Sequence, residues 1–341
     1  MLAMPVVWDE RCRLHEPGAE IFVGVRTPGT ETPDRADALL AALGEPVLAE
    51  PHDDVALLAV HDATLVEFLA SAWNEWEASG LAEDPGQDRV VPYVFSHEKL
   101  GARREPVATW ARPGYFAYDT MTLIGPGTWE AARAAVDVAL TAVDLVQAGA
   151  QHAYALCRPP GHHACRAAYG GSCYLNNAAV AAESMRRAGR SVAVLDIDAH
   201  HGNGTQEIFW RRPDILVASV HADPGAGWFP HFLGFADETG EGANLNLPLP
   251  PGAGDEEWLE AVRRAAEWVG TADGLVVSLG VDAATSDPES PLEVSAAGFH
   301  EAGRIISEMG IPVVFVQEGG YDLETLGPLV LEVLRGVESA G

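Results

Sequence analysis

From about residue 128 onward, short apolar runs rich in valine and isoleucine alternate with amphipathic helical patterns. The run SVAVLDID (191–198) follows the helical pattern AAVAAESMRRAG (178–189), and IPVVFVQEG (311–319) follows SAAGFHEAGRIISEMG (295–310). Continuous apolar strands between amphipathic helices are typical of a parallel sheet that helices cover on both faces. The pattern therefore predicts an α/β protein with a mostly parallel sheet.

The first 127 residues are less regular. ATLVEFLASAWNEWEASG (63–80) has a helical pattern, but residues 80–115 read as a long loop. Loops of that length in a compact domain usually serve a function or mediate contacts. Because the chain has neither an internal repeat nor a low-complexity linker, we predict a single domain spanning residues 1–341.

The formal net charge is -29, from 21 basic and 50 acidic residues. Such a surface repels phosphate backbones and anionic lipid heads, so binding to nucleic acid or membrane is disfavoured, whereas cations are attracted. The same charge also favours solubility. The four cysteines form no CxxC pair, no apolar run reaches transmembrane length, and the start lacks a signal-peptide core. We therefore expect a cytoplasmic protein with reduced thiols.

Polar clusters follow four of the predicted strands. They are RPPGHHAC (158–165), DIDAHHGNGT (196–205), VDAATSDP (281–288) and QEGGYD (317–322). Any one of them alone could consist of helix caps and turn residues. In an open parallel α/β sheet, however, the carboxyl ends of the strands form the ligand crevice. We therefore expect the four clusters to converge.

A metal site is predicted within these clusters. Asp198 and His200 are two residues apart, so in an extended stretch their side chains leave the same face of the chain. A catalytic zinc needs three protein ligands and an open position for water, and Asp282 is the best third ligand. Two carboxylates suit a divalent ion, and ferrous iron accepts the same ligands. The alternative is that these groups simply pair with arginines or cap helices.

Two adjacent histidines, His162 and His163, are candidates for general-base and electrostatic roles beside the metal, if each is oriented by a second acceptor. Asp196 and Asn203 are candidates for those acceptors. A carboxylate partner would keep one histidine cationic, whereas an amide would leave the other free to titrate. Tyr321 has a phenol that could reach an oxyanion.

Together RPPGHHA, DIDAHHGNGTQ, the GVD…DP element and EGGY resemble the zinc-dependent deacetylase branch of the arginase–deacetylase superfamily, over nearly the whole chain. The resemblance implies a single α/β domain with an eight-stranded parallel sheet flanked by helices, and a class II-like deacetylase. By position it implies zinc ligation by Asp198, His200 and Asp282, catalytic roles for His162, His163, Tyr321, Asp196 and Asn203, and a structural potassium site at Asp196, Asp198, His200 and Ser219.

The binuclear arginases of the same superfamily carry further aspartates for a second manganese. Here Gly202 stands at one of those positions, and Gly280 stands two residues before Asp282 at the other. A second metal has lost a carboxylate at both places, so we predict one catalytic metal.

Two stretches resemble the bacterial acetylpolyamine amidohydrolases: ASVHADPGAGWFPHFLGFADETGEG (218–242), and FLASAWNEWEASG with the long loop after it. In that group the loop helps to form a dimer and narrows the active-site entrance, so we expect residues 80–115 at the rim or at a homodimer interface. The resemblance makes Phe229 a substrate-tunnel aromatic, whereas Ser172 replaces a second one. We expect the substrate-binding residues to be Phe229, Gly171, Asp119 and Glu289, with Glu20 a weaker candidate.

We therefore expect hydrolytic removal of acetyl groups from a small cationic acetylated amine, with an acetylpolyamine as the first candidate. Acetyl-lysine in proteins and other small acetylated metabolites are the alternative substrates. A protein that binds acetylated ligands without catalysis is a further alternative. Such a protein could dispense with Tyr321, a tandem histidine or a metal ligand, and this sequence retains all of them.

Overall fold

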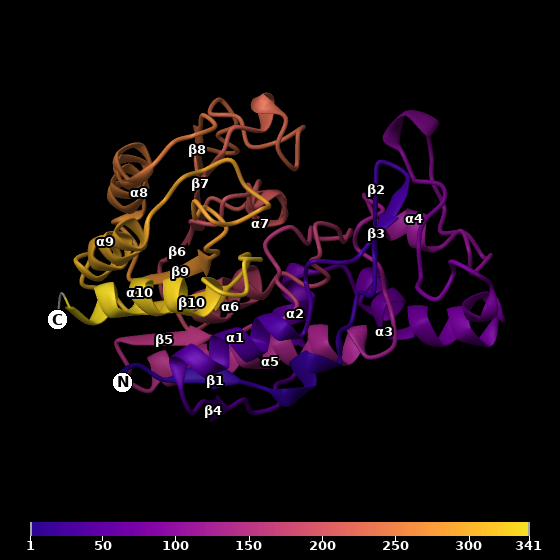
Figure 1. The fold of residues 1–341 in the computed structure, drawn as a ribbon, viewed down its shortest axis with the longest axis horizontal. Helices are drawn as coiled ribbons and strands as arrows, with labels where there is room; N and C mark the ends of the chain where they lie inside the picture. Colours follow the sequence, from indigo (N-terminus) through magenta and orange to yellow (C-terminus); the bar gives the residue numbers. More distant parts are fainter. Residues whose placement is uncertain (1, 340–341) are drawn as a thin grey trace.

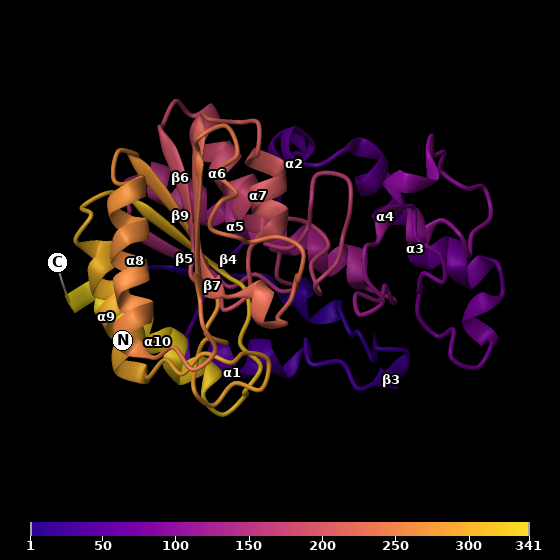
Figure 2. The ribbon, with the colours of Figure 1, turned by 90° about the horizontal axis from the view of Figure 1, so that it is seen from above.

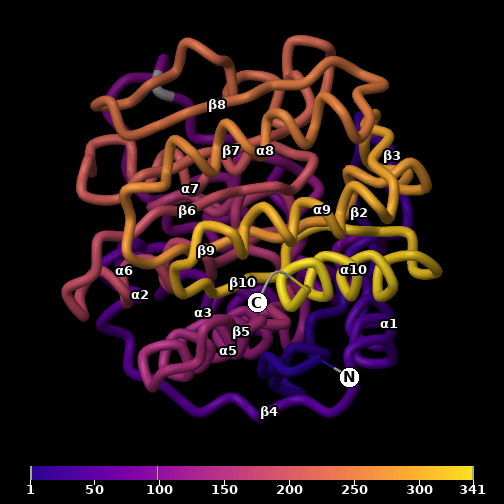
Figure 3. Tube along the Cα trace, turned by 90° about the vertical axis from the view of Figure 1, so that its left-hand side faces the viewer, coloured from indigo at the N-terminus to yellow at the C-terminus, as the bar shows by residue number. Residues whose placement is uncertain are grey.

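A computed structural model of the chain describes residues 2–339. An eight-stranded parallel sheet runs through the molecule in the order β4-β1-β5-β10-β9-β6-β7-β8, which can be followed from bottom to top in Figure 3. The predicted α/β fold with eight parallel strands is confirmed. The strands are β1 (Val6–Trp8), β4 (Val47–Leu48), β5 (His152–Ala155), β6 (Val192–Asp196), β7 (Ile215–Ala222), β8 (Asn244–Leu249), β9 (Gly274–Leu279) and β10 (Val313–Gln317).

The central strands are apolar because both of their faces are covered. Every residue of β6, β9 and β10 is buried, and these strands correspond to the continuous apolar runs in the sequence. Strand β8 reads NLNLPL and did not stand out as an apolar run, since it lies at the edge of the sheet and two of its positions are only half-buried.

Helices cover the sheet in two layers, which Figures 2 and 3 show on opposite sides. In one layer α1 contacts α10, α10 contacts α9 and α9 contacts α8, whereas in the other α2, α5 and α7 each contact α6. Within residues 2–339, no helix has both the length and the apolar character needed to cross a bilayer. One layer contains α1 (Asp34–Leu43), α8 (Asp255–Val269), α9 (Ala296–Ser307) and α10 (Leu326–Ser339); the other contains α2 (Val55–Val60), α5 (Thr128–Gln147), α6 (Asn177–Arg187) and α7 (Asn203–Phe209).

A lobe extends beyond one end of the sheet in both Figure 1 and Figure 2. It contains the hairpin of β2 (Glu20–Phe22) and β3 (Val25–Thr27), helix α3 (Ala63–Ala78), and residues 80–115, which we call the outer loop. The outer loop includes only the short helices η2 (Leu81–Glu83), η3 (Glu98–Leu100) and α4 (Pro113–Phe116). It is fastened to α3 by the Trp76 indole, which donates to the Gln87 carbonyl at 2.8 Å.

The strand order brings the predicted polar clusters to one edge of the sheet. The clusters follow β5, β6, β9 and β10, and these four strands are consecutive neighbours in the sheet, in the order β5-β10-β9-β6. Because all four are parallel, their carboxyl ends lie side by side. Residues more than 150 positions apart in the chain thereby share one site.

Candidate active site

Three side chains at this edge could hold a metal ion. One potential ligand atom from each of Asp198, His200 and Asp282 lies within 4.8 Å of the others. The His200 Nδ1 atom is 3.0 Å from Asp282 Oδ2 and 3.3 Å from Asp198 Oδ1. Both carboxylates are completely buried.

The protonation pattern of this cluster fits a cation. The Nε2 atom of His200 lies 3.0 Å from the backbone carbonyl of Glu289, so Nε2 carries the proton and donates to it. The lone pair of Nδ1 is then directed toward two carboxylates. Burial and the neighbouring Asp198 carboxylate raise the pKa of Asp282 to about 7. Two carboxylates and one imidazole in this arrangement match the ligands of zinc or ferrous iron.

Backbone N–H groups and glycines hold the two carboxylates in place. Asp198 Oδ2 accepts from the Gly319 N–H at 2.7 Å, and Asp282 Oδ1 accepts from the Ala199 N–H at 2.8 Å. A Cβ atom on Gly280 would lie only 1.9 Å from Asp198 Oδ2, and one on Gly319 would lie 2.3 Å from Asp282 Oδ2. These glycines are therefore needed to make room for the ligands.

Gly202 has a similar role on the other side of the cluster. A Cβ atom on this residue would lie 2.2 Å from Oδ2 of Asp196. Gly202 and Gly280 are the two glycines that distinguish this sequence from the arginase pattern. The Asp196 carboxylate fills the space that a side chain at position 202 would need, and the Asp198 carboxylate does the same at position 280.

The tandem histidines contact different partners, as the sequence predicted. His162 Nδ1 is 2.9 Å from Asp196 Oδ2, and His163 Nδ1 is 2.7 Å from Asn203 Oδ1. The two rings lie against each other, with centroids 4.0 Å apart.

The two histidines are driven to opposite charge states. Burial lowers the pKa of His162, but the carboxylates of Asp196, Asp198 and Glu318 outweigh it and raise this pKa to about 10. For His163, burial and the neighbouring imidazoles of His162 and His200 bring the pKa well below its usual value. His162 is therefore cationic and His163 neutral near pH 7.

Tyr321 is held by groups that the sequence analysis did not identify. Its backbone N–H donates to Asp287 Oδ2 at 2.7 Å. The buried guanidinium of Arg35 lies 4.9 Å from the centroid of its ring and donates to the carbonyls of Gly320 at 2.7 Å and Glu318 at 2.6 Å. Arg35 belongs to α1, and nothing in that helical pattern distinguishes it from a solvent-exposed arginine.

A cavity of about 80 Å³ opens beside the tandem histidines. Its lining includes three residues expected to bind substrate, Gly171, Phe229 and Glu289, and the Phe229 ring is 4.8 Å from that of His163. The full lining is Glu20, Thr30, Met121, His163, Gly171, Ser172, His200, Phe229, Glu289 and Tyr321.

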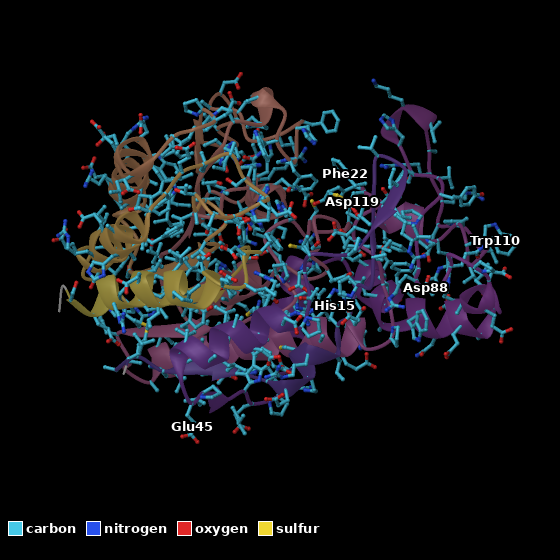
Figure 4. All side chains as sticks on the ribbon, viewed as in Figure 1. His15, Phe22, Glu45, Asp88, Trp110 and Asp119 are labelled. Carbon is cyan, nitrogen blue, oxygen red and sulfur yellow. The ribbon has the colours of Figure 1, made fainter. Side chains whose placement is uncertain are left out.

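Asp119 is the one residue among the four expected to bind substrate that does not line this cavity. Its carboxylate accepts from the Gly171 N–H at 2.6 Å and from the Met121 and Thr122 N–H groups, each at 2.9 Å. Figure 4 labels it at the inner end of the lobe, near Phe22. The side chain therefore supports the Gly171 wall of the cavity from behind and is not part of the lining.

The predicted potassium residues also lie close together. Ser219 on β7 is directly opposite Asp196 on β6 in the strand register, and the Asp198 N–H donates to Asp196 Oδ1 at 3.1 Å. The Ser219 hydroxyl is 2.8 Å from His221 Nδ1.

Comparisons with known proteins point to one family. The model of the histone deacetylase domain matches residues 29–337. Acetylpolyamine amidohydrolase 1 of Pseudomonas aeruginosa is 42% identical over 98% of this chain and 99% of its own, and the acetylpolyamine amidohydrolase of Mycoplana ramosa is 39% identical over the same shares. A crystal structure of acetylpolyamine aminohydrolase from Burkholderia pseudomallei superposes with a TM-score of 0.92 at 37% identity, over 99% of both chains. With the ligand cluster, these matches indicate a metal-dependent enzyme.

The close approach of Gly280 to Asp198 leads to a test of the metal site. Gly280→Ala should displace the Asp198 carboxylate and weaken binding of a divalent metal by about 10- to 100-fold, the usual loss when the support of a ligand is disturbed. Competition with a chelator of known affinity measures this change. Gly254→Ala is the control, because its new Cβ would meet nothing nearer than 3.5 Å. Equal affinity in the Gly280→Ala variant and the wild type would contradict this description of the site.

Proposed function

The chain belongs to the histone deacetylase family, and on that premise we propose that it hydrolyses the amide bond of acetylated polyamines to release acetate and the free amine. The observation that carries the proposal is the cavity in which His163, Tyr321 and the ligand His200 meet two carboxylates, Glu20 and Glu289. The groups proposed to act on the acetamide and the carboxylates that could pair with a cationic amine thus line the same cavity. The acidic chain favours such a substrate over nucleic acid or an anionic membrane.

A divalent metal held by Asp198, His200 and Asp282 would polarise the acetyl carbonyl and make a water molecule more acidic. Zinc is the ion we propose, and ferrous iron suits the same donors. Every other part of the reaction falls to side chains of the protein.

His163 acts as the general base and then as the general acid. Its Nδ1–H donates to Asn203 Oδ1, so Nε2 is free to accept a proton. Since burial keeps this imidazole neutral, it can take a proton from the attacking water and transfer it to the leaving amine. Asn203 keeps the ring in the required tautomer and orientation.

His162 and Tyr321 stabilise negative charge. The pairing of His162 with Asp196 keeps its imidazole cationic beside the reacting groups. Burial raises the pKa of the Tyr321 phenol well above its usual value, so the hydroxyl remains protonated and can donate to the oxyanion that forms from the acetyl carbonyl.

The substrate is tested by comparing kcat/KM on acetylputrescine, acetylspermidine and an acetyl-lysine peptide. We expect the acetylpolyamines to react faster, because Glu20 and Glu289 can pair with the distal ammonium groups. Tyr321→Phe is the matched catalytic control, and it should lose about 10²- to 10³-fold in kcat while retaining its metal. Faster turnover of the peptide would contradict the polyamine assignment, and an unchanged Tyr321→Phe variant would remove the phenol from the scheme.

The proposal also specifies the ions. We expect one divalent ion per chain, loss of turnover on chelation, and recovery with Zn²⁺ or Fe²⁺. Because Asp196, Asp198, His200 and Ser219 are proposed to hold a structural K⁺, replacing K⁺ by Na⁺ in the buffer should lower turnover. Elemental analysis and steady-state rates measure both effects. Two divalent ions per chain would contradict the single-metal proposal, and equal rates in the two salts would contradict the potassium site.

A homodimer is the third part of the proposal, and the outer loop supports it. Val107 is 98% exposed and Leu100 is 73% exposed, and Tyr93 and Trp110 on the same loop are also exposed. Figure 4 labels Trp110 at the far end of the lobe. Apolar side chains gathered on one exposed segment are typical of an interaction surface.

Light scattering on the purified protein tests this interface. The expected mass is twice the 36.2 kDa of one chain, and Val107→Asp combined with Trp110→Asp should reduce it to that of one chain. Leu48→Asp is the control, because Leu48 is 68% exposed but belongs to β4 at the edge of the sheet. A wild-type protein that runs as a monomer would exclude the dimer.

A further inference from the structure

The mechanism above leaves a buried carboxyl group unused. Glu318 directly follows β10, is completely buried, and lies in the same cluster as His162 and Cys173, with one potential ligand atom of each within 4.8 Å of the others. Oε2 of Glu318 accepts from the N–H groups of Gly161 at 2.7 Å and His162 at 3.0 Å. Oε1 lies 3.4 Å from the Ser278 hydroxyl.

Burial destabilises the ionised form of the Glu318 carboxyl group, and the neighbouring groups offset this effect only in part. Burial raises the pKa of Glu318 to about 7. The cationic imidazole of His162 is the neighbour that most opposes this rise in pKa, and the backbone N–H group of Gly161 comes next. A buried carboxylate is unfavourable unless a charged partner or N–H and O–H groups compensate it. The two consecutive backbone donors at Gly161 and His162 therefore provide the hydrogen bonds that hold Glu318 in place, beside the charge of the His162 ring.

The backbone around Glu318 is tied to the other reacting groups. The next residue, Gly319, donates its N–H to Asp198 Oδ2 at 2.7 Å. The carbonyl of Glu318 accepts from Arg35, the same guanidinium that packs over the Tyr321 ring. The segment 318–321 thus contacts a candidate metal ligand through Gly319 and carries the phenol of Tyr321. Its Glu318 side chain is hydrogen-bonded to the turn that carries the tandem histidines.

We propose that Glu318 is a positioning residue, which holds the turn of His162 and His163 at a fixed distance from the turn of Tyr321 by accepting the two backbone N–H groups. This inference rests on the proposed deacetylase function. A catalytic imidazole or phenol displaced by about 1 Å can cost about 10²-fold in rate, so loss of this side-chain bridge between the two turns should lower turnover strongly.

Two substitutions separate this role from a simple need for negative charge. Glu318→Gln retains an amide oxygen that can accept both N–H groups, while its NH₂ group can donate to the Ser278 hydroxyl. Glu318→Ala leaves the two N–H groups buried without an acceptor. The positioning role therefore predicts that glutamine recovers most of the turnover that alanine loses.

The experiment measures kcat, KM and metal content on acetylputrescine for the wild type and both variants. We expect Glu318→Ala to lose about 100-fold in kcat, with KM changed less than about threefold and one metal retained per chain. The kcat of Glu318→Gln should be at least about tenfold higher than that of Glu318→Ala. Glu183→Ala is the matched control: this carboxyl on α6 is also buried, but it pairs with Arg186 and Arg212. It should lower thermal stability and leave kcat unchanged.

The outcomes that overturn the inference are specific. An unchanged kcat in Glu318→Ala, or glutamine and alanine variants that are equally inactive, would exclude positioning through the two N–H groups. If the alanine variant does not fold, Glu318→Asp replaces it: this change keeps the charge but withdraws the carboxylate by one methylene. It should lose more turnover than Glu318→Gln, and the reverse order would overturn the inference. A wild-type protein inactive on every acetylated amine would instead contradict the proposed function itself.

Discussion

The concentration of carboxylates at one buried sheet edge is the constraint on which the rest of the site depends. Asp196, Asp198, Asp282 and Glu318 are all buried there. Isolated buried carboxylates are unstable, so each must be compensated by backbone N–H groups, by an imidazolium or by a cation. The structure supplies N–H groups from three different segments and a cationic His162 beside Asp196. The remaining negative charge of Asp198 and Asp282 marks the position at which a divalent ion could bind.

Glycine is as necessary to this arrangement as the charged residues are. Gly202, Gly280 and Gly319 approach the carboxylates so closely that none of them could carry a Cβ atom without moving a carboxylate. The same two positions at which the arginases place additional metal ligands are thereby closed to side chains. The same packing that accommodates the Asp196–His162 contact therefore supports the proposal of a single divalent metal.

The cavity is lined by both large and small residues around the His163 ring. Phe229 packs against His163 on one side, while Gly171 and the small Ser172 line another. Asp119 and Thr122 support these two residues from behind by accepting their backbone N–H groups at 2.6 and 2.8 Å. A Cβ atom on Gly171 would lie 2.4 Å from the His163 ring, so this wall also limits the position of the proposed general base.

The sequence by itself determined the fold class, and it indicated which segments meet at the candidate site, because both follow from the order of strands and helices along the chain. Apolar runs between amphipathic helices specify a parallel sheet, and a parallel sheet places residues that follow its strands at one edge. Asp198 and His200 share a face because they are two residues apart, and histidines next to each other must share a turn. Because parallel strands end at one edge, Asp282 could be named as the candidate third ligand, and Asp196 and Asn203 as candidate partners of the tandem histidines.

Only the tertiary structure decided the contacts made between distant segments. Arg35 reaches the carbonyl of Gly320 across 285 positions, and Glu318 reaches the N–H of Gly161 across 157 positions, so no local pattern reveals either. The contact between the Asp119 carboxylate and the N–H of Gly171, 52 positions away, could not be read from any local pattern either. A side chain's residue type shows which bonds it can make, whereas the packing of the chain determines which partner is within reach.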